Sequence, residues 1–469
     1  MKTKRLRDLF PDSSEDTEIR DLRINSRDVR PGDLFICTKG ATADRHDFAK
    51  DAVARGAAAV VASRPVDVPV PVVYVENTNA AMPHIAAALY DHPEREMHVT
   101  AITGTNGKTT VATILSEMLG QEKCGYIGTN GICCAAFDEP IRNSCPDADR
   151  MYPYLRRLRD AGCDSAVLEA TSEALHFGRL DTFRFDTVIF TNITQDHLNT
   201  HKTVENYVNA KLLLLGLIKD DAVVILNRDD RYYERERAAA GAHRVVTYGK
   251  DPEADLCIQA IEGVEGGTKI TLGGRTFLSP MIGDFNAYNL AAAFCAMMVR
   301  GIPLSECICR TDRIRPVAGR MEALDFGQKY QVILDYAHTP DAFRKILPYL
   351  AEHKKGRLIT ITGSAGGREK EKRPEMGRLV LDYSDLVIFT MDDPRTEDVN
   401  EIIDDLLSGS EKRNYLRIPD RKEAIWKALS MAEPDDTVLV AGKGRDNYMA
   451  LGTEYLPYCD YDTIKEFYS

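Results

Sequence analysis

The segment AITGTNGKTT at residues 101–110 constrains the fold more than any other part of this chain. A short apolar run at 99–103 leads into it, and a helix-like stretch at 109–119 follows. Gly104 and Gly107 let backbone N–H groups approach a polyphosphate closely, and the start of the helix adds partial positive charge. The segment therefore predicts a strand, a phosphate-binding loop and a helix, in that order.

The end of this loop carries groups that suit ATP and Mg²⁺. Lys108 can reach the outer phosphates, and the hydroxyl of Thr109 or Thr110 can ligate Mg²⁺. The general phosphate loop has its first glycine where this chain has Ile102, and the nearest glycine is Gly104. The departure points to one particular group of ATP-using enzymes.

Short apolar runs alternate with amphipathic stretches along the rest of the chain. Alternation of this kind predicts parallel sheets covered by helices, which is an α/β fold. The expected strands are 57–62, 72–75, 99–103, 166–168, 187–191, 222–226, 332–335, 358–362, 386–390 and 437–441. The expected helices are 109–119, 152–161, 206–217, 287–300 and 340–350.

A length of 469 residues predicts several domains. Breaks in the pattern near 92–97 and 315–320 divide the chain into domains 1–97, 98–317 and 318–469. Glycine-rich turn signals between 244 and 282 predict a small antiparallel insertion in the middle domain.

Charge and composition exclude several classes of protein. The net charge is −12, which disfavours a general nucleic-acid binder. No run of 18 apolar residues is present, so we expect no membrane span, and the basic start lacks the apolar stretch of a signal peptide. Eleven scattered cysteines suggest a reducing compartment. We therefore expect a cytoplasmic monomer that acts on small molecules, without nucleic-acid or membrane partners.

The motif TGTNGKT at 103–109 resembles the ATP loop of the Mur ligase family, and further motifs of that family follow in family order. They cover residues 26 to 446, essentially the whole chain. They are SRDVRPGDLF at 26–35, LEATSEAL at 168–175, TNITQDHL at 191–198, YVNAK at 207–211, GDFNAYNL at 283–290, GRME at 319–322, DYAHTPD at 335–341, GSAGGREKEKRP at 363–374, DDPR at 392–395 and AGKG at 441–444.

The resemblance implies three domains and one reaction. The domains would be an N-terminal uridine-nucleotide-binding α/β domain, a central P-loop ATPase-like parallel sheet and a C-terminal Rossmann-like domain for the amino acid. The family uses ATP to activate the carboxylate of a UDP-N-acetylmuramoyl-peptide as an acyl phosphate, which the amine of an amino acid attacks, in peptidoglycan synthesis. The first-domain motif resembles that of the members that add the third peptide residue.

The resemblance also implies an ATP site with Mg²⁺, in which ATP is a substrate. The metal ligands and catalytic residues would be Thr109, Glu169, His197 and Lys211, with Lys108 on the phosphates. The other ATP contacts would be Gly104, Thr105, Asn106, Gly107, Thr110, Asn286, Asn289, Arg320, Asp335 and His338.

Lys211 shows where the resemblance and the residue pattern disagree. Periodicity alone makes it a surface lysine that keeps its ammonium in water. In the family the lysine of this segment is carbamylated and becomes a metal ligand. A carbamate requires an uncharged amine, so we expect a lowered pKa for Lys211.

The remaining implied contacts concern the other two substrates. The UDP-sugar-peptide would meet Ser26, Ser144, Thr171, Ser172 and Arg179. The usual Asn-Thr-Thr motif reads NSCP at 143–146 here, and the Cys145 thiol is a weak donor. The amino acid would meet Arg368, Asp392, Asp393, Arg395, Gly442 and Asp446.

The identity of the amino acid stays open between two candidates. Arg368 and Arg395 suit the distal carboxylate of meso-diaminopimelate, which we favour. However, Asp393 stands where members using that substrate have asparagine, and Arg445-Asp446 stands where they have His-Glu. The added charge of Asp393 would favour an ammonium, so L-lysine is the alternative, ahead of another diamino acid.

Two other classes of function compete with a catalytic ligase of this kind. The departures at Cys145, Asp393, Arg445 and Asp446 suit a non-catalytic paralogue that binds the nucleotide-sugar peptide. The retained Lys108 argues against it, as do Glu169, His197 and Lys211. A ligase for a folate or polyglutamate would lack the uridine motif at 26–35.

Overall fold

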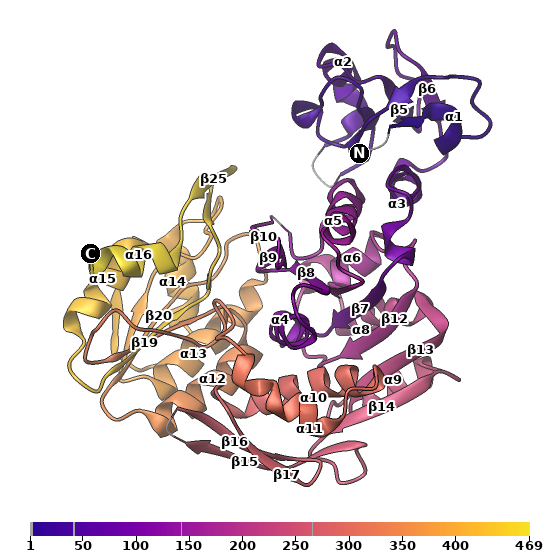
Figure 1. The fold of residues 1–469 in the computed structure, drawn as a ribbon. Coiled ribbons are helices and arrows are strands. Elements are labelled where there is room, and N and C mark those ends of the chain that lie inside the picture. Colours follow the sequence, from indigo (N-terminus) through magenta and orange to yellow (C-terminus); the bar gives the residue numbers. More distant parts are fainter. Residues whose placement is uncertain (1–2, 41–42, 142, 265) are drawn as a thin grey trace.

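The N-terminal part of the chain is a small parallel sheet. A computed structural model describes residues 3–40, 43–141, 143–264 and 266–469. The first sheet has the order β3-β4-β5-β6, formed by Leu22–Arg23, Leu34–Ile36, Ala59–Ala62 and Val72–Tyr74. A two-stranded ribbon, β1 (Lys4–Arg5) with β2 (Glu18–Ile19), and the helices α1 (Leu6–Leu9), α2 (Ala49–Ala54) and α3 (Thr78–Leu89) complete this unit. Figure 1 shows the sheet of this unit at the top of the molecule, above α3 and α5 (Ala148–Asp160), which pack together.

The centre of the molecule is an eleven-stranded sheet. Its order is β10-β9-β8-β11-β7-β12-β13-β14-β15-β16-β17, and the strands from β8 to β14 in this order are parallel. The strands are β7 (His98–Thr103), β8 (Cys124–Gly128), β9 (Gly131–Cys134), β10 (Phe137–Glu139), β11 (Ser165–Glu169), β12 (Phe185–Phe190), β13 (Ile218–Asn227), β14 (Arg244–Gly249), β15 (Leu256–Val264), β16 (Gly267–Leu272) and β17 (Arg275–Ser279).

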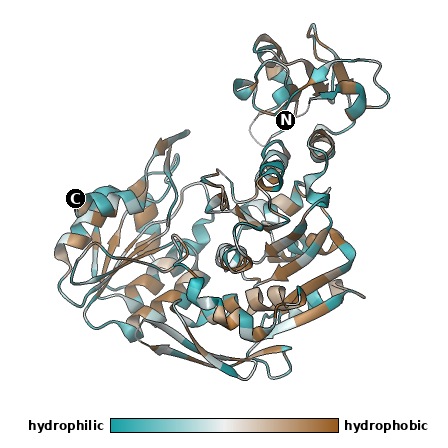
Figure 2. Ribbon diagram, in the orientation of Figure 1, coloured by the Kyte–Doolittle hydropathy of each residue, from teal (hydrophilic) through white to brown (hydrophobic). Residues whose placement is uncertain are grey.

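The central strands are apolar because both faces of the sheet are covered. In β7, Val99 and Ala101 belong to one buried cluster, whereas Ile102 belongs to the cluster on the other face. Figure 2 shows these inner strands as mostly hydrophobic. The covering helices are α4 (Lys108–Leu119), α5, α6 (Ser172–His176), α7 (Leu198–His201), α8 (Val204–Leu212), α9 (Tyr233–Ala239), α10 (Asp284–Val299) and α11 (Leu304–Cys309).

The C-terminal part is a six-stranded sheet between two helix layers. Its order is β18-β19-β23-β20-β21-β22, with β18 antiparallel at the edge and the others parallel. The strands are β18 (Glu322–Leu324), β19 (Gln331–Asp335), β20 (Leu358–Thr362), β21 (Leu386–Phe389), β22 (Tyr415–Arg417) and β23 (Thr437–Ala441). The helices are α12 (Pro340–His353), α13 (Arg373–Tyr383), α14 (Val399–Leu407), α15 (Arg421–Met431) and α16 (Asp460–Phe467), and the hairpin β24 (Tyr448–Leu451) with β25 (Glu454–Pro457) projects from this unit.

The structure confirms the α/β class and a strand at each of the ten expected positions. The antiparallel strands expected between 244 and 282 are present as β15 to β17, and β15 also pairs in parallel with β14, so they extend the central sheet. One expectation needs correction. The helix expected at 206–217 ends at Leu212 and continues as a tighter turn at Leu213–Gly216, because a run of leucines has no periodicity that separates the two helix types.

The part of the chain that the structure describes contains no helix with the length and apolar character needed to span a membrane.

Candidate active site

A cavity of about 1030 Å³ lies where the carboxyl ends of β7, β11 and β12 face the C-terminal unit. Ligands of parallel α/β sheets bind at this end of the strands. The cavity is lined by residues from the central and C-terminal units together. The expected residues that line it are Thr105, Asn106, Gly107, Lys108, Thr109, Thr110, Ser144, Glu169, Thr171, Ser172, Arg179, His197, Lys211, Asn286, Asn289, Arg320, Asp335, His338, Arg368 and Asp446.

The phosphate loop adopts a backbone that requires glycine. Gly107 has a φ of +87° and precedes the first residue of α4. A Cβ at this position would lie 2.5 Å from the Oδ1 atom of Asn289 on α10. Because a real Cβ does not approach an oxygen so closely, Gly107 both turns the chain and lets α10 pack against the loop.

Two lysine side chains converge on one carbonyl of this loop. Lys108 Nζ donates to the carbonyl oxygens of Gly104 and Thr105, each at 2.9 Å. Lys211 Nζ donates to the same Gly104 oxygen at 2.7 Å and lies 4.6 Å from the centre of the Tyr207 ring. Lys211 is 1% exposed, so the expectation of a surface lysine from periodicity is wrong.

The burial of these lysines lowers the pKa of both. For Lys211 the pKa lies well below its ordinary value, first because burial disfavours the charged form and then because Lys108 repels it. Burial likewise lowers the pKa of Lys108. No carboxylate forms an ion pair with either Nζ atom among the described residues. The site therefore has room for an anion such as a polyphosphate.

Glu169 lies beside the phosphate loop and contacts several hydroxyl groups. Its carboxylate accepts hydrogen bonds from the Thr129 backbone N–H at 2.7 Å, the Tyr126 hydroxyl at 2.9 Å and the Thr109 hydroxyl at 3.0 Å. The Thr109 hydroxyl and the Glu169 carboxylate are thus neighbours, and both are hard oxygen ligands of the kind that Mg²⁺ prefers.

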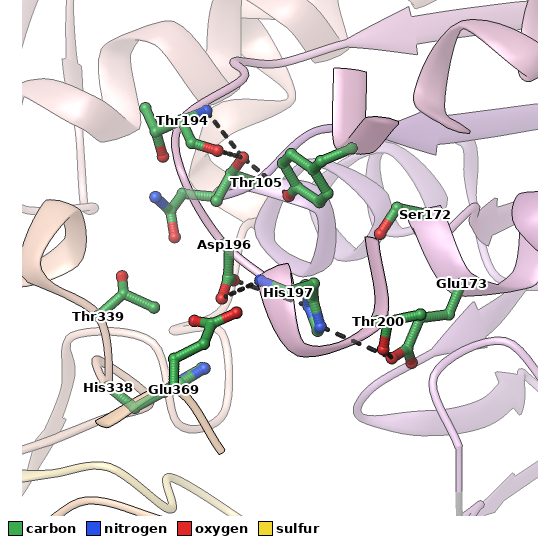
Figure 3. A network of polar contacts seen from close by, with 12 residues as sticks. Thr105, Ser172, Glu173, Thr194, Asp196, His197, Thr200, His338, Thr339 and Glu369 are labelled. Carbon is green, nitrogen blue, oxygen red and sulfur yellow. Dashed lines mark hydrogen bonds and ion pairs between the residues drawn. The ribbon is translucent and has the colours of Figure 1, made fainter. Parts of the chain in front are cut away.

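His197 lines the cavity and immediately precedes α7. Its backbone has a φ of +55°. Its Nδ1 lies 3.8 Å from Glu173 Oε1 and its Nε2 lies 3.6 Å from Asp196 Oδ2, as Figure 3 shows. Burial lowers the pKa of His197, which favours a neutral imidazole with a lone pair available to a metal.

The candidate adenine contacts form a polar group on α10. Asn289 Nδ2 donates to Asn286 Oδ1 at 2.9 Å, and Asn286 Nδ2 donates to the carbonyl of Ile282 at 2.8 Å. The Tyr288 hydroxyl on the same helix donates to Asp229 at 2.7 Å. These residues line the cavity beside the phosphate loop.

The C-terminal unit reaches the phosphate loop directly. Arg320 Nη2 donates to the Thr109 hydroxyl at 3.1 Å, and its guanidinium lies 4.6 Å from the centre of the Tyr336 ring. Asn106 Nδ2 donates to Asp341 at 2.6 Å. Asp335 has both carboxylate oxygens bonded to backbone N–H groups, at Met321 and Ala337, so it shapes the link between the units.

The candidate amino-acid residues separate into two groups. Arg368 and Asp446 line the cavity, whereas Asp392, Asp393, Arg395 and Gly442 do not. Asp393 Oδ1 accepts hydrogen bonds from Lys443 Nζ and from the Ala450 backbone N–H, both at 2.9 Å. Its charge is therefore compensated inside the protein.

Arg395 and Arg445 are also engaged within the C-terminal unit. Arg395 Nη1 donates to the carbonyl of Gly366 at 2.5 Å. Arg445 pairs with Glu322 and lies 3.5 Å from the centre of the Tyr461 ring, which gives it a structural role.

The candidate contacts for the nucleotide-sugar peptide surround Cys145. Arg179 pairs with Asp147 at 2.6 Å and donates to the Cys145 carbonyl at 3.3 Å. The Ser144 hydroxyl lies 2.8 Å from that of Thr129. Ser26 does not line the cavity, because it lies in the N-terminal unit.

The sequence missed several residues that line the cavity, including Glu173, Tyr207 and Asp341. Tyr207 lies four residues before Lys211 on α8, which is the spacing of neighbours on one helix face. Asp341 contacts a residue 235 positions away, and no local pattern signals such a contact.

Three family models match the chain in succession. They are described as "Mur ligase family, catalytic domain" at residues 18–95, "Mur ligase middle domain" at 102–297 and "Mur ligase, glutamate ligase domain" at 319–444.

Curated relatives match over nearly their full length. The UDP-N-acetylmuramoyl-L-alanyl-D-glutamate–2,6-diaminopimelate ligase of Bacillus cereus is 40% identical, over 96% of this chain and 94% of its own. The enzyme of the same name from Geobacillus kaustophilus is 38% identical, over 94% of this chain and 92% of its own.

Solved structures agree with the fold. A structure of UDP-N-acetylmuramoyl-L-alanyl-D-glutamate–2,6-diaminopimelate ligase is 28% identical, covers 100% of this chain and 99% of its own, and has a TM-score of 0.67. MurF ligase from Thermotoga maritima in complex with ADP, at 20% identity, covers 96% of this chain and 97% of its own with a TM-score of 0.69, which is a likeness of fold.

Proposed function

The chain belongs to the Mur ligase family of ATP-dependent ligases, and we propose that it joins meso-diaminopimelate to the D-glutamate of UDP-N-acetylmuramoyl-L-alanyl-D-glutamate. The names of the two curated relatives carry these substrates. In this proposal residues 1–97 bind the uridine nucleotide, residues 98–317 bind ATP and residues 318–469 bind the amino acid. The reaction takes place in the cytoplasm.

The contacts of Asp393 favour one of the two candidate amino acids over the other. The sequence argument for L-lysine rested on the negative charge of this residue. In the structure Lys443 and the Ala450 N–H bond to its carboxylate, so the charge is compensated before any substrate arrives. Arg368 stays exposed in the cavity and is suited to a bidentate contact with a distal carboxylate. This combination favours diaminopimelate over lysine.

In the first step a carboxylate oxygen of the D-glutamate attacks the γ-phosphorus of ATP, and ADP leaves. Lys108 and Arg320 face this transfer with positive charge, which is what phosphoryl transfer between anions needs. In the second step the amine nitrogen attacks the acyl carbon, a C–N bond forms, phosphate leaves and the amine loses a proton.

The residues at the loop fit Mg²⁺. Across residues 3–40, 43–141, 143–264 and 266–469, no three His, Cys, Asp or Glu side chains gather as a metal site. The Thr109 hydroxyl beside the Glu169 carboxylate nevertheless offers a pair of hard oxygens, which phosphate oxygens of the substrate would complete. We assign Thr109 and Glu169 to one ion, and His197 with carbamylated Lys211 to a second. Bound Mg²⁺ would neutralise charge on the phosphates.

Lys211 is suited to carbamylation. Its lowered pKa favours the neutral amine, whose nitrogen can attack the carbon of CO₂ to form a C–N bond with loss of one proton. The product would place an oxygen-bearing anion beside Lys108.

The test is phosphate release from ATP with the UDP-dipeptide and either meso-diaminopimelate or L-lysine. We expect release with diaminopimelate at least tenfold above lysine, and loss of this preference in Arg368→Ala. Preference for lysine would contradict the assigned amino acid. Binding of the nucleotide-sugar peptide without release with either amine would indicate the non-catalytic paralogue.

A further inference from the structure

The loop after β20 carries Arg368, the residue proposed to meet the distal carboxylate. Residues 363–372 of this loop are held within the C-terminal unit by several contacts, two of them to Glu397. The Gly367 N–H donates to Glu397 at 2.6 Å, and Lys370 pairs with the same carboxylate at 3.0 Å. Gly367 has a φ of +63°, so the chain turns immediately before Arg368.

The next residue, Glu369, forms a hydrogen bond to the central unit. Glu369 Oε1 accepts a hydrogen bond from the backbone N–H of Asn199 at 3.1 Å. Asn199 lies in α7, two positions after His197. Figure 3 shows Glu369 reaching toward Asp196 and His197 from the side of His338.

The opposite side of α7 is held by the central unit. The Thr200 hydroxyl donates to Glu173 Oε1 at 2.8 Å, and the same oxygen lies 3.8 Å from His197 Nδ1. Two carboxylates from different units thus contact consecutive residues of α7. The segment that begins with His197 is therefore bonded to both units.

We propose that Glu369 is a positioning residue that ties the amino-acid loop to the histidine segment, so that Arg368 is placed for the incoming amino acid when the C-terminal unit closes on the central unit. Two glycines, Gly366 and Gly367, come directly before the exposed Arg368, and glycine leaves the backbone more conformational freedom than other residues. A bond that spans the two units one residue further along restricts it. The identity of the amino acid in this inference rests on the proposed function.

The test compares three variants. Glu369→Ala removes the acceptor, Glu369→Gln keeps an Oε1 atom that can still accept from Asn199, and Glu371→Ala changes an exposed carboxylate in the same loop as the matched control. The first readout is hydrogen exchange of the Asn199 amide, which requires no substrate. The second is the KM for diaminopimelate, with the KM for ATP beside it.

In Glu369→Ala we expect exchange at Asn199 to be about tenfold faster and the KM for diaminopimelate about tenfold higher, which is 1.4 kcal/mol. The KM for ATP should stay within twofold, and Glu369→Gln and Glu371→Ala should stay near wild type. Unchanged exchange at Asn199 in Glu369→Ala would overturn the inference. An equal change in both KM values and in kcat would overturn it as well, because it would indicate a general structural role.

The two proposals fail in different ways. Wild-type turnover with lysine instead of diaminopimelate would contradict the proposed substrate. The role of Glu369 could then still be tested by hydrogen exchange of the Asn199 amide and by the KM for lysine.

Discussion

Lys211 in the central unit and Lys443 in the C-terminal unit are buried to the same degree, but their pKa values are shifted in opposite directions. Each is 1% exposed. Lys211 meets a backbone carbonyl and another lysine, and its pKa is well below the ordinary value. Burial also acts to lower the pKa of Lys443, but Asp392, Asp446 and Asp393 outweigh it and raise that pKa.

The difference separates a reactive amine from a structural cation. A buried charge without a counter-ion is costly, and a protein keeps it where a ligand or a chemical modification compensates it. A buried charge inside a cluster of carboxylates is already compensated and holds the surrounding loops in place. The phosphate-loop region is therefore built to receive an anion, and the loops around Asp393 are built to stay in one conformation.

The largest expected effect comes from removing a charge at the phosphate loop. Lys108→Met should lower kcat/KM for ATP by about 10³-fold, since Lys108 and Arg320 are the two cations that face the phosphates. The thermal unfolding midpoint should stay close to wild type. Lys465→Met, at an exposed position, is the control and should leave kcat/KM unchanged. If kcat/KM for ATP falls less than tenfold in Lys108→Met, Lys108 does not contact the reacting phosphates.

Lys211→Arg tests whether charge or carbamylation matters. Arginine keeps a positive charge but cannot form the carbamate, so we expect about a 10²-fold loss of kcat. Native mass spectrometry of the intact protein in bicarbonate should show the added mass of one CO₂ on wild type and not on the variant. Full activity in Lys211→Arg would show that Lys211 acts as a cation, like Lys108.

Lys443→Met should affect stability where the previous variants affect catalysis. It leaves Asp393 and Asp446 without their counter-ion, and breaking a buried pair costs about 3–5 kcal/mol. Denaturant unfolding measures the loss. Adding Asp393→Asn should recover part of it, and a double variant as unstable as the single one would contradict the pairing.

The smallest expected effect comes from Glu236, whose contribution to the stability of the folded protein depends on pH. It is 0% exposed, and neither carboxylate oxygen has a hydrogen-bond partner among the described residues. Burial, followed by repulsion from Asp230, raises its pKa to about 8. Between the ordinary pKa of about 4.5 and this value the unfolded chain releases the proton that the folded chain keeps, so stability falls as pH rises through that range.

Glu236→Gln should therefore stabilise the protein by roughly 3 kcal/mol at pH 7. The gain should disappear below about pH 4.5, where both states of the wild type are protonated. Unfolding of the two proteins measured from pH 4 to 8 gives this difference directly. A gain that does not change with pH would mean that the proton is not its cause.

Much of the framework could be predicted from local patterns. Each expected strand is present, because a strand covered on both faces reads as a short apolar run wherever it lies. Family membership was also predicted and is confirmed by relatives over nearly the full chain. The order of strand, loop and helix around Gly107 was predicted too and is present, because each of these elements depends on neighbouring residues.

Other features could not be predicted because they depend on distant contacts. The end of α8 and the place of β15 to β17 depend on how neighbouring elements pack, and their sequences suit more than one arrangement. The burial of Lys211 depends on Gly104, 107 positions earlier in the chain. The roles of the amino-acid residues and of the metal ligands stay predictions until substrates are tested.

The sequence by itself determined the α/β architecture, the ATP loop and the family, because glycine conformations, apolar periodicity and motif order are properties of short segments. Only the tertiary structure decided which charges are compensated. Asp393 and Lys443 are 50 positions apart, and each could have been a substrate contact until the fold brought them to 2.9 Å. Charge compensation depends on distance in space, and the chain order of the residues does not contain that distance.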